Sequence, residues 1–364
     1  FVRYGMASSS SRDSCFPYAC PGTIVRWMAL WPLVFLGFWQ GCCLISAGRY
    51  CDGDSATVWG NVRVTDARMN IGFIGAGNMG RPMIRHLTGA GHAVKVFVRR
   101  KEILSQIEAL GAVGVESPAA AALQADFVLL NVTATEDVED VLFGKDGAAA
   151  AMAPGCICID FSTISPAASA RFADRLSAGA INFLDAPVSG GVKGAEAATL
   201  SIMIGGAAEV LIKAMPLLRL LGEKITHIGP SGAGQVAKAC NQIIQVINIQ
   251  GIAEAMLYAA RMGADPGRVI DAISAGMAGS KMLDLMGPKM AARDFLAGIE
   301  ARLHAKDIAM VAAAAQALGI DMPATAVANR QLERLLALGW GREDTSSLLR
   351  VLETHATGGS NLAA

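Results

Sequence analysis

The sequence has few charged residues and few aromatic ones. Charged side chains make up 17% and aromatic side chains 6% of the 364 residues, and 31 basic residues balance 31 acidic ones. Without net charge, the chain lacks the basic surface typical of nucleic-acid binding. The 53% of apolar residues suits globular domains with large cores. These values favour a protein that binds small molecules, and we expect no nucleic-acid partner.

Cysteines with metal-ligand spacing are also lacking. The eight cysteines are Cys15, Cys20, Cys42, Cys43, Cys51, Cys156, Cys158 and Cys240. Their spacing gives neither a zinc pattern nor a disulfide framework. We therefore expect no metal site and a reducing, cytoplasmic location.

Residues 1–68 show no alternation of strand and helix patterns, and we expect this leader to lie outside the fold. Within it, residues 27–48 (WMALWPLVFLGFWQGCCLISAG) are uncharged and long enough to cross a bilayer. Arg3, Arg12 and Arg26 precede them, which is compatible with a membrane anchor or a signal sequence. The alternative is that translation starts at Met69, and in that case we expect no membrane contact.

From Met69 an apolar run, a glycine turn, a helical stretch and the run AVKVFV form a βαβ pattern. Gly75, Gly77 and Gly80 give G-x-G-x-x-G at the strand-to-helix turn. The first glycine permits the turn, the second lets a pyrophosphate approach, and the third lets the helix pack on the strand. Helix N–H groups then face the phosphates. The turn predicts a dinucleotide site, with Ala76, Asn78 and Met79 as its other members.

The end of the next strand bears on which dinucleotide binds. An NAD site usually carries an acidic residue about 20 residues beyond the glycines. Here Arg99 and Arg100 follow Val98. Two guanidinium groups suit a 2′-phosphate, so we expect a preference for NADP(H), with NAD(H) as a second possibility. Alternatively, both arginines are solvated loop charges.

Further strand patterns lie at 126–133, 156–163, 181–191, 199–206 and 224–229, with helical patterns between several of them. After Ser231 the pattern is all-helical, with expected stops at 263–266, Gly287-Pro288 and 319–323. The sequence therefore predicts a doubly wound α/β domain with a parallel sheet at 69–230. An all-α domain at 231–357 and a flexible tail at 358–364 follow it.

The stretch GAGQVAKACNQIIQVIN, residues 232–248, predicts an apolar helix with one polar stripe. Its members are Lys238, Asn241, Gln245 and Asn248. One interpretation is an interdomain helix whose Lys238 extends to the surface. The other places Lys238 in a cleft, where burial lowers its pKa and lets it donate a proton to a carbonyl oxygen. Asn241 would then hold the same carbonyl.

Four segments, in order and spacing, carry a family resemblance: GFIGAGNMGRPM, DAPVSGG at 185–191, GAGQVAKACNQ at 232–242 and HAKD at 304–307. From Met69 to about Glu353 the chain resembles the β-hydroxyacid dehydrogenases. The resemblance implies a Rossmann-type domain followed by a helical domain, and an enzyme active on a short 3-hydroxy or 3-oxo acid. It also implies a homodimer or homotetramer.

The resemblance assigns roles to single residues. It makes Lys238 the catalytic lysine and Asn241 its helper, both also contacting substrate. It places the substrate carboxylate at Ser189, Gly190 and Gly191, and it makes Thr163, in the cofactor-contacting segment DFSTISP, a further substrate-binding residue. It places the cofactor against Val132, Thr133, Ser162 and Lys306, the last of which closes over it.

Within the family, AGMAGSKMLD at 275–284 and MPATAVA at 322–328 are closest to the reductases of tartronate semialdehyde (2-hydroxy-3-oxopropionate). Three positions depart from the family pattern: Thr133 replaces Pro, Val98 replaces Asn or Asp, and Ile299 replaces Phe. A 3-hydroxyisobutyrate dehydrogenase is the main alternative. An imine reductase and a non-catalytic dinucleotide-binding module are remoter ones, because relatives of both kinds generally lack the lysine. A 6-phosphogluconate dehydrogenase would need a longer helical domain.

Overall fold

The computed structural model describes residues 68–357. The predicted anchor at 27–48, the tail at 358–364 and all of the predicted leader before Arg68 lie outside these described residues. The described part forms a nine-stranded sheet in the order β3-β2-β1-β4-β5-β6-β8-β7, with β9 beside β8. The strands are β1 (Asn70–Ile74), β2 (Ala93–Phe97), β3 (Val113–Val115), β4 (Phe127–Leu130), β5 (Ile157–Asp160), β6 (Asn182–Asp185), β7 (Val188–Ser189), β8 (Leu200–Gly206) and β9 (Gly222–Gly229).

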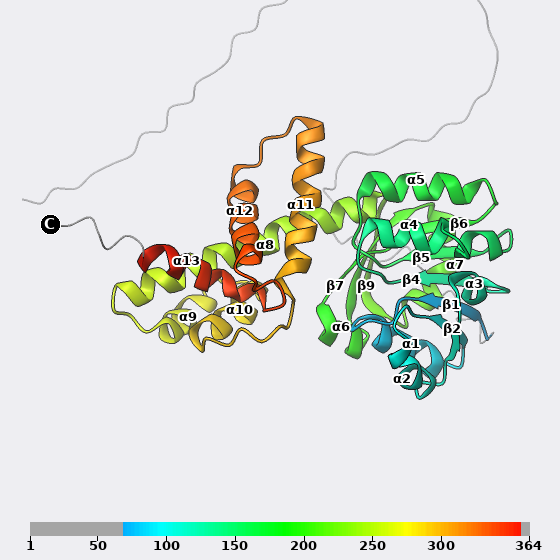
Figure 1. The fold of residues 1–364 in the computed structure, drawn as a ribbon, viewed down its shortest axis with the longest axis horizontal. Coiled ribbons are helices and arrows are strands. Elements are labelled where there is room, and N and C mark those ends of the chain that lie inside the picture. The colour runs from blue at the N-terminus through cyan, green and yellow to red at the C-terminus, as the bar shows by residue number, and fades with distance from the viewer. Residues whose placement is uncertain (1–67, 358–364) are drawn as a thin grey trace, which may run out of the picture. The chain divides into compact units, whose positions relative to one another are not determined.

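Helices lie on both faces of the sheet, with α1 and α2 on one side and α4 and α5 on the other (Figure 1). The helices of this region are α1 (Gly80–Gly89), α2 (Leu104–Glu108), α3 (Pro118–Ala122), α4 (Thr135–Phe143), α5 (Pro166–Ser177), α6 (Gly191–Ala197) and α7 (Ala208–Leu218), with 3₁₀ turns at Lys101–Ile103 and Ala148–Ala151. Alternate residues of β1 enter different cores: Phe73 packs in the cluster that contains Met83 and Leu87, and Ile74 in the cluster that contains Val138 and Phe172. β1, β2, β4, β5 and β6 pair in parallel. The predicted doubly wound α/β fold is confirmed.

The sheet is not parallel throughout, because β8 runs antiparallel to both β6 and β7. The connection from β6 to β8, residues 186–199, contains the short β7 and the seven-residue α6. β7 pairs antiparallel with the first part of β8, and the last part of β8 pairs antiparallel with β6. The expectation of a parallel sheet is wrong at this edge, and the sequence pattern also missed the short β3.

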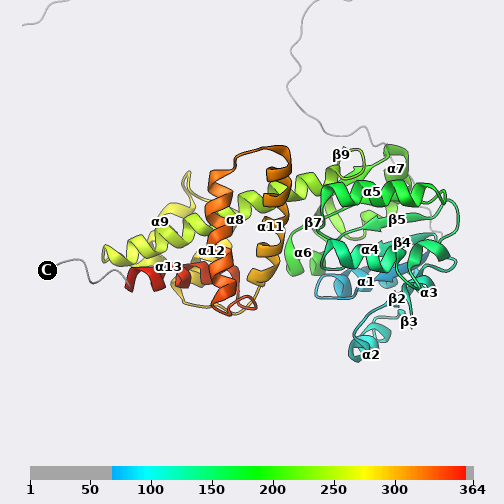
Figure 2. The ribbon, with the colours of Figure 1, turned by 45° about the horizontal axis from the view of Figure 1, so that its top comes forward.

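Beyond β9 the described chain is helical, as predicted. It forms α8 (Ala233–Arg261), α9 (Pro266–Ser274), α10 (Lys281–Ala291), α11 (Ala301–Leu318), α12 (Pro323–Ala337), the 3₁₀ turn η3 (Thr345–Ser347) and α13 (Leu348–Thr357). α8 packs on β8 and β9 and, further along, on α10 and α13. α11 and α12 lie side by side (Figure 2).

The expected helix stop at Gly287-Pro288 is wrong, because α10 continues through both residues. Proline removes one backbone hydrogen bond but does not end this helix. A Cβ on Gly287 would lie 3.2 Å from Ile270 Cδ1 of α9. The glycine therefore permits close packing of two helices.

By length and composition alone, α8 could cross a membrane, and 39% of its most apolar window is buried in the protein. A core helix passes the same test. The buried Gln235, Lys238 and Gln242 of α8 bond to other elements, as expected of a core helix.

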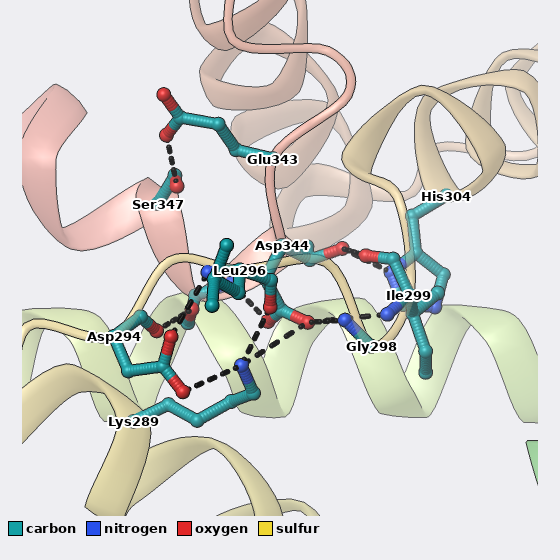
Figure 3. Close-up of polar contacts among 11 residues, drawn as sticks. Lys289, Asp294, Leu296, Gly298, Ile299, His304, Glu343, Asp344 and Ser347 are labelled. Atoms are coloured by element: carbon teal, nitrogen blue, oxygen red, sulfur yellow. Dashed lines mark hydrogen bonds and ion pairs between the residues drawn. The ribbon is translucent and has the colours of Figure 1, made fainter.

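Asp344 organises the segment that leads from α10 into α11 (Figure 3). Its carboxylate is 1% exposed. Oδ2 accepts hydrogen bonds from the backbone N–H groups of Gly298 and Ile299 at 2.8 and 3.1 Å, and Oδ1 accepts one from Ser346 at 3.0 Å. Lys289 Nζ lies 3.8 Å from Asp344 Oδ2. One buried carboxylate thus fixes the backbone that precedes α11.

Replacing Asp344 by alanine should destabilise the protein. The substitution leaves three backbone N–H groups without their acceptor, and we expect a loss of about 2–4 kcal/mol in the free energy of unfolding. Urea denaturation followed by circular dichroism measures it. The exposed Asp321 is a matched control, and Asp321→Ala should stay within about 0.5 kcal/mol of wild type. A similarly small effect for Asp344→Ala would contradict the proposed role of the carboxylate.

Candidate functional site

The glycine turn after β1 has the geometry of a phosphate cradle. Gly75 has φ +98°, and a Cβ there would collide with the Asn131 carbonyl. A Cβ on Gly80, the first residue of α1, would collide with the Gly75 carbonyl. A Cβ on Gly77 would meet no atom within 4 Å. The outer glycines close the turn, and the middle one faces open space into which a pyrophosphate fits.

The three other residues predicted for this turn have contacts that hold it in place. Ala76 is buried, Met79 packs against the core, and Asn78 Oδ1 accepts a hydrogen bond from Arg81 at 3.2 Å. Beyond β2, Arg100 is exposed and Arg99 forms an ion pair of 2.9 Å with Asp137. The Phe97 carbonyl at the end of β2 accepts a hydrogen bond from Gly75 N–H at 3.0 Å, so Arg99, two residues further on and paired with a carboxylate, follows directly from the strand that borders the glycine turn.

Ser162, after β5, holds the loop that follows β4. Its Oγ accepts a hydrogen bond from Val132 N–H at 2.9 Å, and its own N–H donates to Asp160 Oδ1 at 2.9 Å. Burial raises the pKa of Asp160 to about 7, which hydrogen bonds from Ser162 oppose. The Ser162 hydroxyl therefore orders two predicted cofactor segments.

Lys306 of α11 joins the same two segments. Its Nζ donates to the carbonyl oxygens of Thr133 and Thr163, each at 2.7 Å, and lies 3.0 Å from Asp307 Oδ1. The structure brings Lys306 together with two predicted site residues that lie far from it in sequence.

The start of α8 is fixed by Asp185 at the end of β6. Its carboxylate accepts hydrogen bonds from Gly232 N–H at 2.7 Å and Gln235 N–H at 2.9 Å. At Gly234, a Cβ would collide with the Met203 carbonyl of β8. The Gln235 side chain donates to Ser162 O at 2.8 Å and accepts from Ile164 N–H at 3.1 Å. α8 therefore approaches the sheet as closely as its backbone allows.

Lys238, one turn into α8, is 9% exposed. Its Nζ donates to the Val188 carbonyl at 2.9 Å. Burial lowers the pKa of Lys238 to about 8; Asp307 opposes this shift, and Lys306 adds to it. The ammonium is thus partly buried beside residue 188 and is not a surface charge.

The Ser189-Gly190-Gly191 strap follows directly. Gly190 has φ +134° and Gly191 φ +62°, which favour glycine at both positions, and α6 begins at Gly191. A Cβ on Gly190 or Gly194 would lie 3.2 Å from Leu200 Cδ2. Backbone N–H groups at such a turn can hold a carboxylate. The structure places this strap next to the residue that accepts from Lys238.

The predicted polar stripe of α8 needs correction. Asn241, Gln245 and Asn248 are only partly buried, and Asn241 Nδ2 donates to Gln242 Oε1 at 2.9 Å. The buried polar residues are Gln235, Lys238 and Gln242. The apolar residues Val236 and Ile244 of the same helix are 50% and 61% exposed. The helix is turned so that the lysine faces the sheet and these apolar residues face outward.

Gln242 and Asp307 are two site residues for which the sequence patterns predicted no role. Gln242 Nε2 donates to Asp307 Oδ2 at 2.7 Å, which ties α8 to α11. Gln235 and Gln242 lie three residues before and four after Lys238, a spacing that could have identified this face.

His304 lies one turn before Asp307 on α11. It is buried, and its Nδ1 lies 2.8 Å from Thr345 Oγ1. Burial lowers the pKa of His304 to about 4, which keeps the ring neutral near pH 7. It therefore adds no positive charge beside Lys238. Among residues 68–357, no group of three or more His, Cys, Asp and Glu side chains could hold a metal ion.

Comparisons with known proteins match both regions. Residues 70–229 match the family described as the NAD binding domain of 6-phosphogluconate dehydrogenase, and residues 232–352 match the NAD-binding family of NADP-dependent 3-hydroxyisobutyrate dehydrogenase. The chain is 40% identical to 2-hydroxy-3-oxopropionate reductase of Escherichia coli over 288 residues, which cover 79% of this chain and 98% of that protein. The chain belongs to the 3-hydroxyisobutyrate dehydrogenase family. It is an NAD(P)-dependent oxidoreductase for small hydroxy acids.

Other members of the 3-hydroxyisobutyrate dehydrogenase family are also similar. The chain is 38% identical to 3-hydroxyisobutyrate dehydrogenase of Pseudomonas aeruginosa over 267 residues, which cover 71% of this chain and 89% of that enzyme. It is similar in structure to the 3-hydroxyisobutyrate dehydrogenase of Mycobacterium tuberculosis with L-serine. The TM-score is 0.73 and the identity 32%, over 79% of this chain and 99% of that one.

The shifted pKa of Lys238 predicts opposite pH profiles for the two directions of the reaction. If Lys238 exchanges the proton with the substrate, oxidation of a hydroxy acid needs its neutral amine, so the oxidation rate should rise with pH through about 8 and then level off. Reduction needs the ammonium, so its rate should fall through the same range. Initial rates measured between about pH 6 and pH 10 test this expectation. Parallel profiles for both directions would exclude Lys238 as the titrating group.

Proposed function

We propose that the enzyme reduces a short 3-oxo acid, and that tartronate semialdehyde, reduced to glycerate, is its preferred substrate. The similarity to the Escherichia coli reductase supports this choice, since it covers 98% of that protein. The single observation that carries the proposal is the buried Lys238, hydrogen-bonded to the residue that precedes the Ser189-Gly190-Gly191 strap. Oxidation of 3-hydroxyisobutyrate is the second candidate, favoured by the Pseudomonas and Mycobacterium relatives.

The residues present fit a nicotinamide dinucleotide. The open space at Gly77 admits a pyrophosphate, and the loops that end at Thr133 and Thr163 lie within reach of Lys306. When bound, the dinucleotide supplies the hydride. The chain supplies binding, orientation and a proton.

Lys238 supplies the proton in this mechanism. Its ammonium donates to the oxygen of the substrate carbonyl as negative charge develops there. The lowered pKa makes both protonation states accessible near pH 8, so the same amine accepts the proton in the reverse direction. Asn241, one turn further along α8, holds the same oxygen through its amide.

The substrate carboxylate is held by the strap. The N–H groups of Gly190 and Gly191 and the hydroxyl groups of Ser189 and Thr163 provide donors for an anion. Carboxylate and aldehyde are separated by one carbon in a 3-oxo acid. A strap adjacent to the acceptor of Lys238 suits that short distance.

Methionine at position 238 tests the proton donor. Lys238→Met keeps the unbranched shape but removes the proton, so kcat for tartronate semialdehyde should fall by about 10²–10⁴-fold. The Kd for cofactor should stay within about twofold, because Lys238 Nζ bonds to the Val188 carbonyl and not to the glycine turn. A variant with near wild-type kcat would make Lys238 a structural residue.

Cofactor choice is part of the proposal: we expect NADP(H) to be preferred, with Arg99 and Arg100 as the residues that hold the 2′-phosphate. Arg99→Ala should weaken NADPH binding by about 1.5 kcal/mol, roughly tenfold, and NADH binding little. Fluorescence titration with both cofactors measures this. Arg171 of α5 is an exposed control position. Equal effects of Arg99→Ala on both cofactors would show that Arg99 is a solvated loop charge without a role in cofactor choice.

Substrate choice is decided by initial rates on tartronate semialdehyde, methylmalonate semialdehyde and succinate semialdehyde, each with both cofactors. The first should give the largest kcat/KM. A larger value for methylmalonate semialdehyde would favour the second candidate.

We further propose that the enzyme is a cytoplasmic homodimer or homotetramer.

A further inference from the structure

The ion pair between Arg99 and Asp137 spans the edge of the predicted cofactor site. Arg99 follows β2, and Asp137 lies in the first turn of α4, after β4. Because β1 lies between β2 and β4, the two side chains reach across the carboxyl end of the strand that carries the glycine turn. A dinucleotide in a doubly wound sheet binds at this end.

The two partners are held unequally. Asp137 Oδ2 accepts a hydrogen bond from Ala134 N–H at 3.1 Å, as the third helical residue of a capping arrangement. Oδ1 faces Arg99 at 2.9 Å. The Asp137 side chain is 20% exposed and that of Arg99 64%. The carboxylate is therefore the fixed partner, and the guanidinium is the one that can move.

We propose that Asp137 is a specificity-determining residue that reduces the preference of this enzyme for NADP(H) over NAD(H). This inference rests on the proposed role of Arg99. A 2′-phosphate that binds Arg99 must share the guanidinium with Asp137, and this competition weakens the phosphate contact. The uncharged ribose hydroxyl of NADH gains little from the guanidinium and therefore loses little to the competition. Asp137 acts through Arg99 and touches no reacting atom.

The test replaces Asp137 by asparagine in the full-length protein. Asparagine keeps an oxygen that can accept from Ala134 N–H but removes the charge. Dissociation constants for NADPH and NADH, from fluorescence titration, give the preference as Kd(NADH)/Kd(NADPH). We expect Asp137→Asn to raise this ratio about two- to tenfold, mainly through tighter NADPH binding, with a smaller change at high salt.

Two further variants separate charge from structure. Glu139→Gln removes a negative charge from the same helix, but Glu139 pairs with Arg175 at 2.8 Å, so the ratio should stay unchanged. Asp137→Glu restores the charge and keeps an acceptor at the third helical position, so it should return the ratio toward wild type. A ratio that rises equally in Glu139→Gln, or that Asp137→Glu does not restore, would overturn the proposal.

The double variant Arg99→Ala/Asp137→Asn distinguishes the two proposals. If Asp137 acts through Arg99, its replacement should leave the ratio unchanged once Arg99 is absent. An Arg99→Ala variant that lowers the ratio, together with an Asp137→Asn variant that leaves it unchanged or lowers it, would reject the role of Asp137 and keep that of Arg99. An Arg99→Ala variant with an unchanged ratio would instead reject the proposed cofactor contact.

Discussion

The hydrogen bonds that the Asp185 carboxylate accepts from the start of α8 are the constraint on which the site depends. One carboxylate at the end of β6 accepts from Gly232 and Gln235, and the absence of a side chain at Gly234 lets the helix touch β8. Lys238 follows within one turn, so its position relative to the sheet is set by backbone contacts. Its acceptor, Val188, lies three residues after Asp185 on the same segment. A single short stretch therefore positions both the helix and the strap that faces it.

Charge at the site is balanced among a few buried groups. Lys238 is desolvated, Lys306 adds a second positive charge, and Asp307 compensates both. The Gln242 amide donates to the other oxygen of Asp307 and so joins α8 to α11 without adding a charge. The neutral His304 fills the adjacent space without adding charge. A further positive charge in this cluster would lower the pKa of Lys238 more. Removal of the Asp307 carboxylate would also lower the pKa of Lys238, because Asp307 stabilises the ammonium form.

Much of this arrangement could be predicted from sequence, because glycine spacing and alternating apolar runs are local signals. The turn at Gly75, Gly77 and Gly80 follows β1, and Arg99 and Ser162 lie just after β2 and β5, where their patterns indicated. The face of α8 did not, since Asn241 and Gln242 are adjacent polar residues and only contacts with Asp307 decide which is buried. The antiparallel direction of β8 is seen only in its pairing with β6 and β7, and α10 continues through Pro288 in a segment where Gly287 packs against Ile270. Such long-range contacts produce no periodic pattern in the amino-acid sequence.

The strap also rests on an apolar support. Leu200, at the start of β8, lies beneath Gly190 and Gly194, and a methyl group at either position would press against the same Cδ2 atom. Positions 194 and 200 thus share one small volume, and a larger residue at 194 requires a smaller residue at 200, whereas the positive φ of Gly190 favours glycine there whatever the space. As sequences diverge, substitutions at positions 194 and 200 should occur together. The orientation of the strap's backbone donors is thereby linked to a residue of the sheet core that is wholly buried.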